Sequence, residues 1–290
     1  MTDQLSLDAL EAIDIHVHVM AAGDDASDPS SINKGARAYF GTDEGAPTID
    51  EIAEYYRARN MAAVVFTVDS ELHTLRTRIS NQHVIEGAQR NADVLIPFAS
   101  VDPMRGNSAL REVEQLLEQG VVKGFKLHPS TQAFFPDDRS IYPYYDLVQA
   151  AELPIIFHTG QTGIGAGSPG GSGIKLKYSN PLHIDEVAAD FPRLPIVMAH
   201  PSVPWLDIGL SIVGHKSNVF MDLSGWAPKY FEPKLLRFAN SLLKRKVVFG
   251  SDYPLLTPDR WMKEFAELEM KDEVRPLILK ENAAALLGLS

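Results

Sequence analysis

Short apolar runs alternate with amphipathic stretches along most of the chain. Eight of these runs are rich in β-branched residues and lack a polar face, which is typical of buried parallel strands. They cover residues 12–17, 62–68, 94–101, 121–127, 153–158, 194–200, 218–223 and 246–250. The pattern therefore predicts eight β-strands.

The stretches between these runs have the spacing of amphipathic helices. Thr48 and Glu51 form a capping-box pair ahead of one apolar face, and Asn107 precedes another that Gly120 ends. Residues 184–191 and 235–242 repeat the pattern. Eight strands separated by helices predict a single α/β domain over residues 1–290, a closed (β/α)₈ barrel. An open doubly wound sheet is the alternative, but no glycine-rich dinucleotide fingerprint follows the first strand.

Two segments, 20–47 and 160–181, are too long to be simple connections, and the second is rich in glycine. Each follows the C-terminal end of a predicted strand, which is the end where barrels carry their active sites. Long loops in such positions act as lids or binding loops more often than as surface insertions. We therefore expect both segments to border the functional site.

The amino-acid composition limits which molecules the protein can be expected to bind. Lysine and arginine number 27 against 38 aspartate and glutamate residues, so the net charge is −11 and nucleic acid is disfavoured. The absence of cysteine excludes disulfides, thiolate metal sites and a cysteine nucleophile. The first residues lack the pattern of a signal peptide, and no apolar run has the length of a membrane span. We expect a cytoplasmic protein with a small-molecule substrate, and leave open a homo-oligomer.

Five metal-compatible or proton-transferring side chains fall at predicted strand ends. His16 and His18 are two residues apart, so both point to the same side of the first strand. His158 and His200 end the fifth and sixth strands, and Asp252 follows the eighth. Each alone is as well explained by an ordinary structural role, but barrel closure brings all five ends together. Imidazole and carboxylate ligands suit Zn²⁺, with Mn²⁺ as the alternative.

The motifs IDIHVH, FHTG, AHP and FGSDYP occur in this order and resemble those of the amidohydrolase superfamily. More narrowly, they are similar to the amidohydrolase-2 branch, which contains aminocarboxymuconate semialdehyde decarboxylase, resorcylate-type decarboxylases and hydrolases of aromatic catabolism. The resemblance runs from residue 13 to the C-terminal ENAAALLGL. It implies that one divalent metal is bound by His16, His18, His158 and Asp252. It also implies that His200 acts as a base or hydrogen-bond partner beside metal-bound water, while Asp252 can accept a proton as well.

Further residues are candidates for substrate contacts. Lys126 and His128 are two apart on the fourth strand and can both point inward. In two-metal amidohydrolases a lysine on this strand is carboxylated, but the resemblance to a one-metal branch favours a grip on a substrate carboxylate or carbonyl; a purely structural role is the alternative. Trp226, Tyr178 and Tyr253 would form a wall for an aromatic ring, or else fill the bases of loops.

The sequence does not decide which bond of the substrate the enzyme would break. A hydrolase would use metal-activated water on a carbonyl group, whereas a non-oxidative decarboxylase would hold a carboxylate and protonate the neighbouring carbon. Lys175 and Lys177, beside the glycine-rich segment, suit a phosphate-bearing or acyl-CoA substrate, and this segment is similar to that of aryl β-ketoacyl-CoA hydrolases. We take hydrolysis of such a carbonyl compound as the main hypothesis, with decarboxylation second and a non-catalytic metal- or ligand-binding barrel third.

Overall fold

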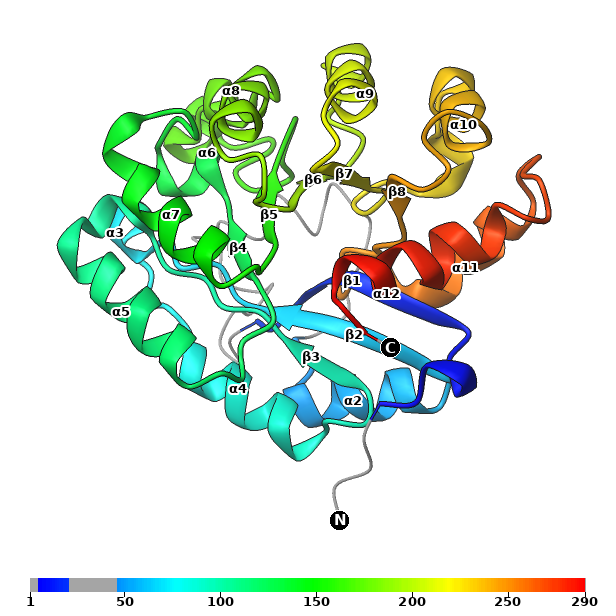
Figure 1. The fold of residues 1–290 in the computed structure, drawn as a ribbon, viewed down its shortest axis with the longest axis horizontal. Coiled ribbons are helices and arrows are strands. Elements are labelled where there is room, and N and C mark those ends of the chain that lie inside the picture. The colour runs from blue at the N-terminus through cyan, green and yellow to red at the C-terminus, as the bar shows by residue number, and fades with distance from the viewer. Residues whose placement is uncertain (1–4, 21–45, 290) are drawn as a thin grey trace.

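A computed structural model describes residues 5–20 and 46–289, so most of the predicted loop 20–47 lies outside the described residues. Eight parallel strands stand in the middle of the molecule, with helices around them (Figure 1). Strands β1 to β3 pair in order, and so do β4 to β8. They cover Ala12–His18, Met61–Phe66, Leu95–Pro97, Phe125–Leu127, Ile155–His158, Ile196–Ala199, Val219–Asp222 and Val247–Val248.

Two seams join these groups of strands into a closed ring. A parallel bridge between Ala99 and Phe125 links β3 to β4, and a second between Val17 and Tyr253 links β1 to the segment after β8. At the second seam the Ile15 amide also donates to the Phe249 carbonyl at 3.1 Å. The ring is therefore the (β/α)₈ barrel that the sequence predicts.

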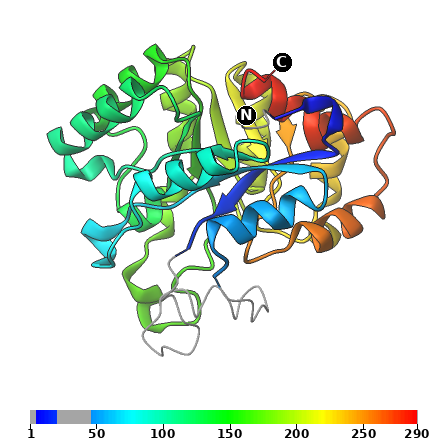
Figure 2. The same ribbon diagram turned by 90° about the horizontal axis from the view of Figure 1, so that it is seen from below.

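The helices cover the outside of this ring, as the perpendicular view also shows (Figure 2). The longer ones are α2 Ile49–Arg57, α4 Asn81–Arg90, α5 Asn107–Glu118, α7 Tyr142–Ala150, α8 Leu182–Asp190, α9 Leu206–His215, α10 Pro233–Ala239 and α11 Pro258–Ala266. Shorter ones are α3 Glu71–Thr74, α6 Pro129–Gln132 and α12 Asn282–Leu286. Among the described residues, no helix combines the length and apolar character needed to cross a membrane.

Local signals set most helix ends, with two corrections. The capping box is present, because the Glu51 amide donates to the Thr48 hydroxyl and the Glu51 carboxylate accepts from the Thr48 amide. Asn107 is the first residue of α5 rather than its cap, since Gly106, at a φ of +59°, takes that position. Helix α10 ends at Ala239, so Leu242 is 72% exposed and does not belong to its buried face.

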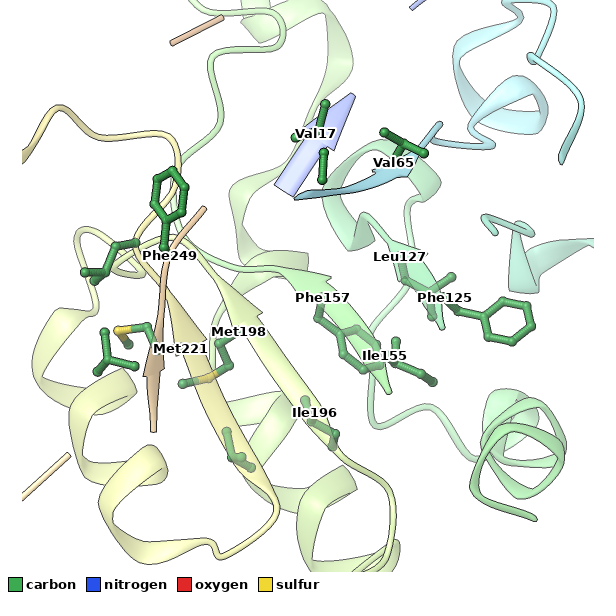
Figure 3. Packing of buried hydrophobic residues seen from close by; sticks show 14 of the residues in the cluster. Val17, Val65, Phe125, Leu127, Ile155, Phe157, Ile196, Met198, Met221 and Phe249 are labelled. Carbon is green, nitrogen blue, oxygen red and sulfur yellow. The ribbon is translucent and has the colours of Figure 1, made fainter. Parts of the chain in front are cut away.

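Apolar strand residues are divided between two layers. One set, including Phe125, Phe157 and Met198, packs between the strands and the helices (Figure 3). A smaller set, including Ile13 and Val248, fills the inside of the barrel. Burying an apolar side chain of this size stabilises the fold by about 1.5–3 kcal/mol. Polar residues such as His16 and Lys126 are also fully buried in the strands.

Candidate metal centre

An irregularity in β1 directs its two histidines inward. Ile13 and Ile15 belong to the inner apolar layer, whereas Val17 belongs to the outer one. The pairing of β1 with β2 shifts register between Asp14 and Val17. Such a bulge turns successive side chains, and His16 and His18 consequently both reach the interior cluster described next.

Three of the predicted ligands lie together at one edge of the barrel. Asp252 Oδ1 is 3.0 Å from His18 Nε2 and 3.4 Å from His16 Nε2. His16 is fully buried, Asp252 is nearly so, and His18 is partly exposed. Ligand atoms from these three residues lie within 4.8 Å of one another, which is close enough for one ion to reach all of them.

The fourth predicted ligand, His158, contacts His200. His158 Nδ1 is 3.1 Å from His200 Nε2, and the His158 ring stacks on that of His128, with centroids 3.8 Å apart. His158 Nε2 and His128 Nδ1 are buried without a hydrogen-bond partner among the described residues. An unpartnered buried imidazole nitrogen is costly unless a ligand satisfies it, so His158 Nε2 suits metal coordination.

Lys126 also enters this cluster, as predicted from its place on β4. Its side chain is completely buried, and its Nζ is 3.1 Å from His16 Nε2. Burial lowers the pKa of Lys126 to about 8, although the nearby charges of Asp222 and Asp252 oppose this shift. The barrel interior therefore holds an ammonium group beside the histidines.

The electrostatics favour the forms that bind a metal. Burial, and then the Lys126 charge, lower the pKa of His16 to about 3. Burial by itself would raise the pKa of Asp252, but the hydrogen bond from His18 and the charges of the histidines hold it well below its usual range. Metal ligands must be unprotonated, so the lowered pKa values of His16 and Asp252 favour the forms of these two residues that bind a divalent cation.

Asp222, the last residue of β7, and Ser224 just beyond it also enter the site, although neither is among the predicted site residues. Asp222 Oδ2 is 2.9 Å from His16 Nδ1, and the Ser224 hydroxyl is 3.0 Å from the same nitrogen. The Ser224 hydroxyl is also 2.9 Å from His200 Nδ1. The position of Asp222 at the end of the seventh strand was the available signal, but sequence spacing cannot tell which side chains it meets.

The predicted substrate contacts are less closely grouped. Lys175 and Lys177 are exposed, and Lys177 Nζ lies 5.1 Å from the Tyr178 ring centroid, over a small aromatic cluster. Trp226 is half-buried against the outer apolar layer. Tyr253 belongs to that outer layer and stacks on Tyr55 of α2, which favours the alternative that it fills the base of a loop.

Comparisons with known proteins agree with this architecture. The model of the amidohydrolase family matches residues 13–289. An uncharacterized TIM-barrel protein from Bordetella bronchiseptica is similar in structure, with a TM-score of 0.75, 22% identity, and coverage of 96% of this chain and 98% of that chain. No curated protein matches the sequence.

Two further solved structures are decarboxylases. The 5-carboxyvanillate decarboxylase from Novosphingobium aromaticivorans, solved with manganese and 4-hydroxy-3-methoxy-5-nitrobenzoic acid, has a TM-score of 0.70 at 15% identity, covering 99% of this chain and 98% of that chain. The 2,6-dihydroxybenzoate decarboxylase from Rhizobium has a TM-score of 0.70 at 13% identity, covering 97% and 99%. At such identities the likeness concerns the fold.

Proposed function

Because the chain belongs to the amidohydrolase family, we propose that it is a divalent-metal-dependent decarboxylase of a small aromatic or unsaturated carboxylic acid. The sequence alone favours a hydrolase, but two observations support decarboxylation, which was the second hypothesis. Solved structures of similar fold are decarboxylases with bound manganese. The charge of the site, in addition, suits a carboxylate.

The charge balance around His16 is the main support for a carboxylate substrate. Three charged side chains contact its imidazole: Asp222, Asp252 and Lys126. With a divalent cation added, two carboxylates and one ammonium leave one positive charge in a buried site. Buried charges require neutralisation, and a substrate with a single carboxylate provides it.

In this proposal one set of residues binds the metal and another transfers a proton. His16, His18, Asp252 and His158 would hold the metal, which, when bound, polarises an oxygen of the substrate. Manganese is supported by the structures of similar fold, and zinc is the alternative that the nitrogen ligands suggest.

His200, beside the ligands, would carry a proton to the carbon that bears the carboxylate, while Asp252, as a carboxylate, can only accept a proton. Burial lowers the pKa of His200, which makes its protonated form a more ready donor. The bond from this carbon to the carboxylate then breaks, CO₂ leaves, and the electron pair restores the unsaturated system. Lys126 would grip the carboxylate before this step.

Hydrolysis of an aryl β-ketoacyl-CoA is the second candidate. The exposed lysines Lys175 and Lys177, beside a glycine-rich segment, suit the phosphates of such a substrate. The same metal ligands would serve, but water would be consumed and its oxygen would appear in the product.

One assay separates these functions. Enzyme loaded with Mn²⁺ or Zn²⁺ is given a panel of hydroxybenzoates and aryl β-ketoacyl-CoA esters in ¹⁸O-labelled water. Release of CO₂ with replacement of carboxylate by hydrogen supports decarboxylation, and ¹⁸O in a cleaved product supports hydrolysis. Metal binding with neither activity would instead favour a non-catalytic barrel.

A matched pair of variants tests the role of the buried ammonium group. Lys126→Met keeps most of the side-chain volume but removes the charge, and we expect kcat/KM for the carboxylate to fall by a factor that corresponds to about 1.5–3 kcal/mol. Lys123→Met, at an exposed position two residues before β4, is the control. Equal kinetics for the two variants would contradict the charge argument.

A further inference from the structure

Ser224 lies between the two histidines that serve different roles in the proposed reaction. It follows β7 by two residues and is completely buried. Its hydroxyl oxygen is 3.0 Å from His16 Nδ1 and 2.9 Å from His200 Nδ1. The same hydroxyl donates a hydrogen bond to Asp222 Oδ1.

The hydrogen-bonding capacity of a hydroxyl group determines the direction of these contacts. Serine offers one proton and two lone pairs. Asp222, as a carboxylate, only accepts, so it takes the single Ser224 proton. The two lone pairs of the oxygen then remain for His16 and His200, and each of these rings must donate from Nδ1.

Two independent acceptors lead to the same assignment. The Ser224 backbone carbonyl, which cannot donate, is 3.0 Å from His200 Nδ1. Asp222 Oδ2 is 2.9 Å from His16 Nδ1. Both Nδ1 atoms therefore carry hydrogen, whichever acceptor each one prefers.

We propose that Ser224 is a positioning residue whose hydroxyl and backbone carbonyl, together with Asp222, hold His16 and His200 in the Nδ1–H tautomer. The Nε2 lone pair of His16 is thereby directed to the metal position, and the Nε2 of neutral His200 is kept as a proton acceptor. The tautomer assignment stands on geometry alone, whereas its meaning for catalysis rests on the proposed function.

The assignment extends to a third histidine. When His200 Nε2 is the acceptor, the contact of 3.1 Å to His158 requires that His158 Nδ1 donate. Its Nε2 then holds an unshared lone pair, and this is the buried atom that lacks a partner among the described residues. The acceptors at Ser224 and Asp222 thus set the direction of the hydrogen bonds along His200 and His158, and the same acceptors orient His16.

The position of Ser224 also decides between two groupings of potential ligands. His16, His200 and Asp222 present ligand atoms within 4.8 Å of one another, on the opposite side of the His16 ring from Asp252. The Ser224 hydroxyl lies within hydrogen-bond distance of His16 Nδ1, His200 Nδ1 and Asp222 Oδ1, and so lies among all three residues. It therefore occupies the space that an ion would need there.

The backbone after β7 and after β8 leaves the His16 and His200 rings little freedom to turn away from Ser224. A Cβ atom added to Gly225 would lie 2.6 Å from His200 Nδ1, and one added to Gly250 would lie 2.9 Å from the Cβ of His16. Approach of the backbone at both glycines confines the two rings against Ser224. The contacts of the hydroxyl group are therefore part of a tightly packed arrangement.

The test compares two buried serines in metal-free and metal-loaded protein. Ser224→Ala removes the shared hydroxyl, while Ser202→Ala removes one that contacts Thr159 Oγ1 at 2.7 Å at the end of β6. We expect Ser224→Ala to weaken Mn²⁺ or Zn²⁺ binding, measured by chelator competition, by at least ~10-fold, as for other partners of ligating histidines. At saturating metal its kcat should fall more than its KM changes. Ser202→Ala should retain the affinity of the parent.

Imidazole ¹⁵N spectra of the metal-free parent protein give a readout that needs neither activity nor a folded variant. We expect the protonated nitrogen of both His16 and His200 to be Nδ1. Protonation at Nε2 in either ring, or equal metal affinities for the two serine variants, would overturn the inference. A parent with the expected tautomers and no turnover would refute the proposed function and leave the assignment intact.

Discussion

Replacing Asp102 with asparagine is expected to stabilise the protein, and increasingly so as the pH rises. Asp102 follows β3 and is fully buried. Its Oδ1 accepts from the Met104 amide at 2.9 Å, whereas its Oδ2 has no partner among the described residues. Burial, and then the charge of Asp69, raise the pKa of Asp102 from 3.8 to about 7.

The sign and the size of the effect follow from this shift. The folded protein keeps a proton on Asp102 that the unfolded chain releases near pH 4, so the contribution of this carboxyl group to stability is full below that pH and is lost as pH rises through about 7. A shift of this size corresponds to about 4 kcal/mol at most. Relaxation and water penetration reduce such values in real proteins, and we expect the advantage of Asp102→Asn to grow by about 2 kcal/mol between pH 4.5 and pH 8.5.

Urea unfolding at the two pH values measures this difference. Asparagine keeps the acceptor for the Met104 amide but cannot ionise. Asp138→Asn is a close control, because Asp138 accepts from the Ser140 amide in the same i to i+2 geometry, also at 2.9 Å, yet is exposed. A pH dependence that is the same in parent and Asp102→Asn would refute the reasoning, as would a variant that is less stable at pH 8.5.

Four further outcomes are expected. Gly225→Ala, at a φ of +70° and with its new Cβ 2.6 Å from His200 Nδ1, should lose at least ~1 kcal/mol in urea unfolding and lower kcat more than it changes KM. Asp252→Asn should weaken metal binding in a chelator competition by more than the ~10–100-fold typical of outer-shell partners. Dialysis against a chelator should abolish turnover and lower Tm, and Mn²⁺ or Zn²⁺ at 100 times its Kd should restore about 2.7 kcal/mol of stability. A double variant, Lys175→Ala with Lys177→Ala, should raise KM for CoA esters but not for hydroxybenzoates; unchanged binding of CoA esters would exclude the phosphate contact.

The sequence predicts the fold well because its apolar pattern records burial on both faces of each strand. The extents of strands are less predictable: residues 94–101 suggested a long strand, whereas β3 covers only Leu95–Pro97. A strand ends where its neighbour stops pairing, and this depends on distant parts of the chain. The bulge in β1 is invisible for the same reason, although the inward direction of His16 and His18 was expected.

The site is predictable at the level of strand ends and not beyond. Alternation along β4 allowed Lys126 and His128 to point inward together, and the structure places Lys126 against His16. The pairing of His158 with His200, and the place of Ser224 between two rings, depend on side-chain rotation and on the path of each loop. Tyr253 points outward because the chain turns at Asp252, whose φ is +75°.

The seam that closes the barrel determines when, during synthesis of the chain, the metal ligands can come together. The Asp252 amide donates to the His16 carbonyl at 3.0 Å, and the His18 amide donates to the Tyr253 carbonyl at 2.8 Å, so the ligands themselves form the junction of the first and last strands. In a nascent chain both histidines precede the Asp252 carboxylate by more than 200 residues. Metal capture by the complete ligand set must therefore wait until Asp252 has been made, and it joins the first and last strands of the barrel through a contact of very long range.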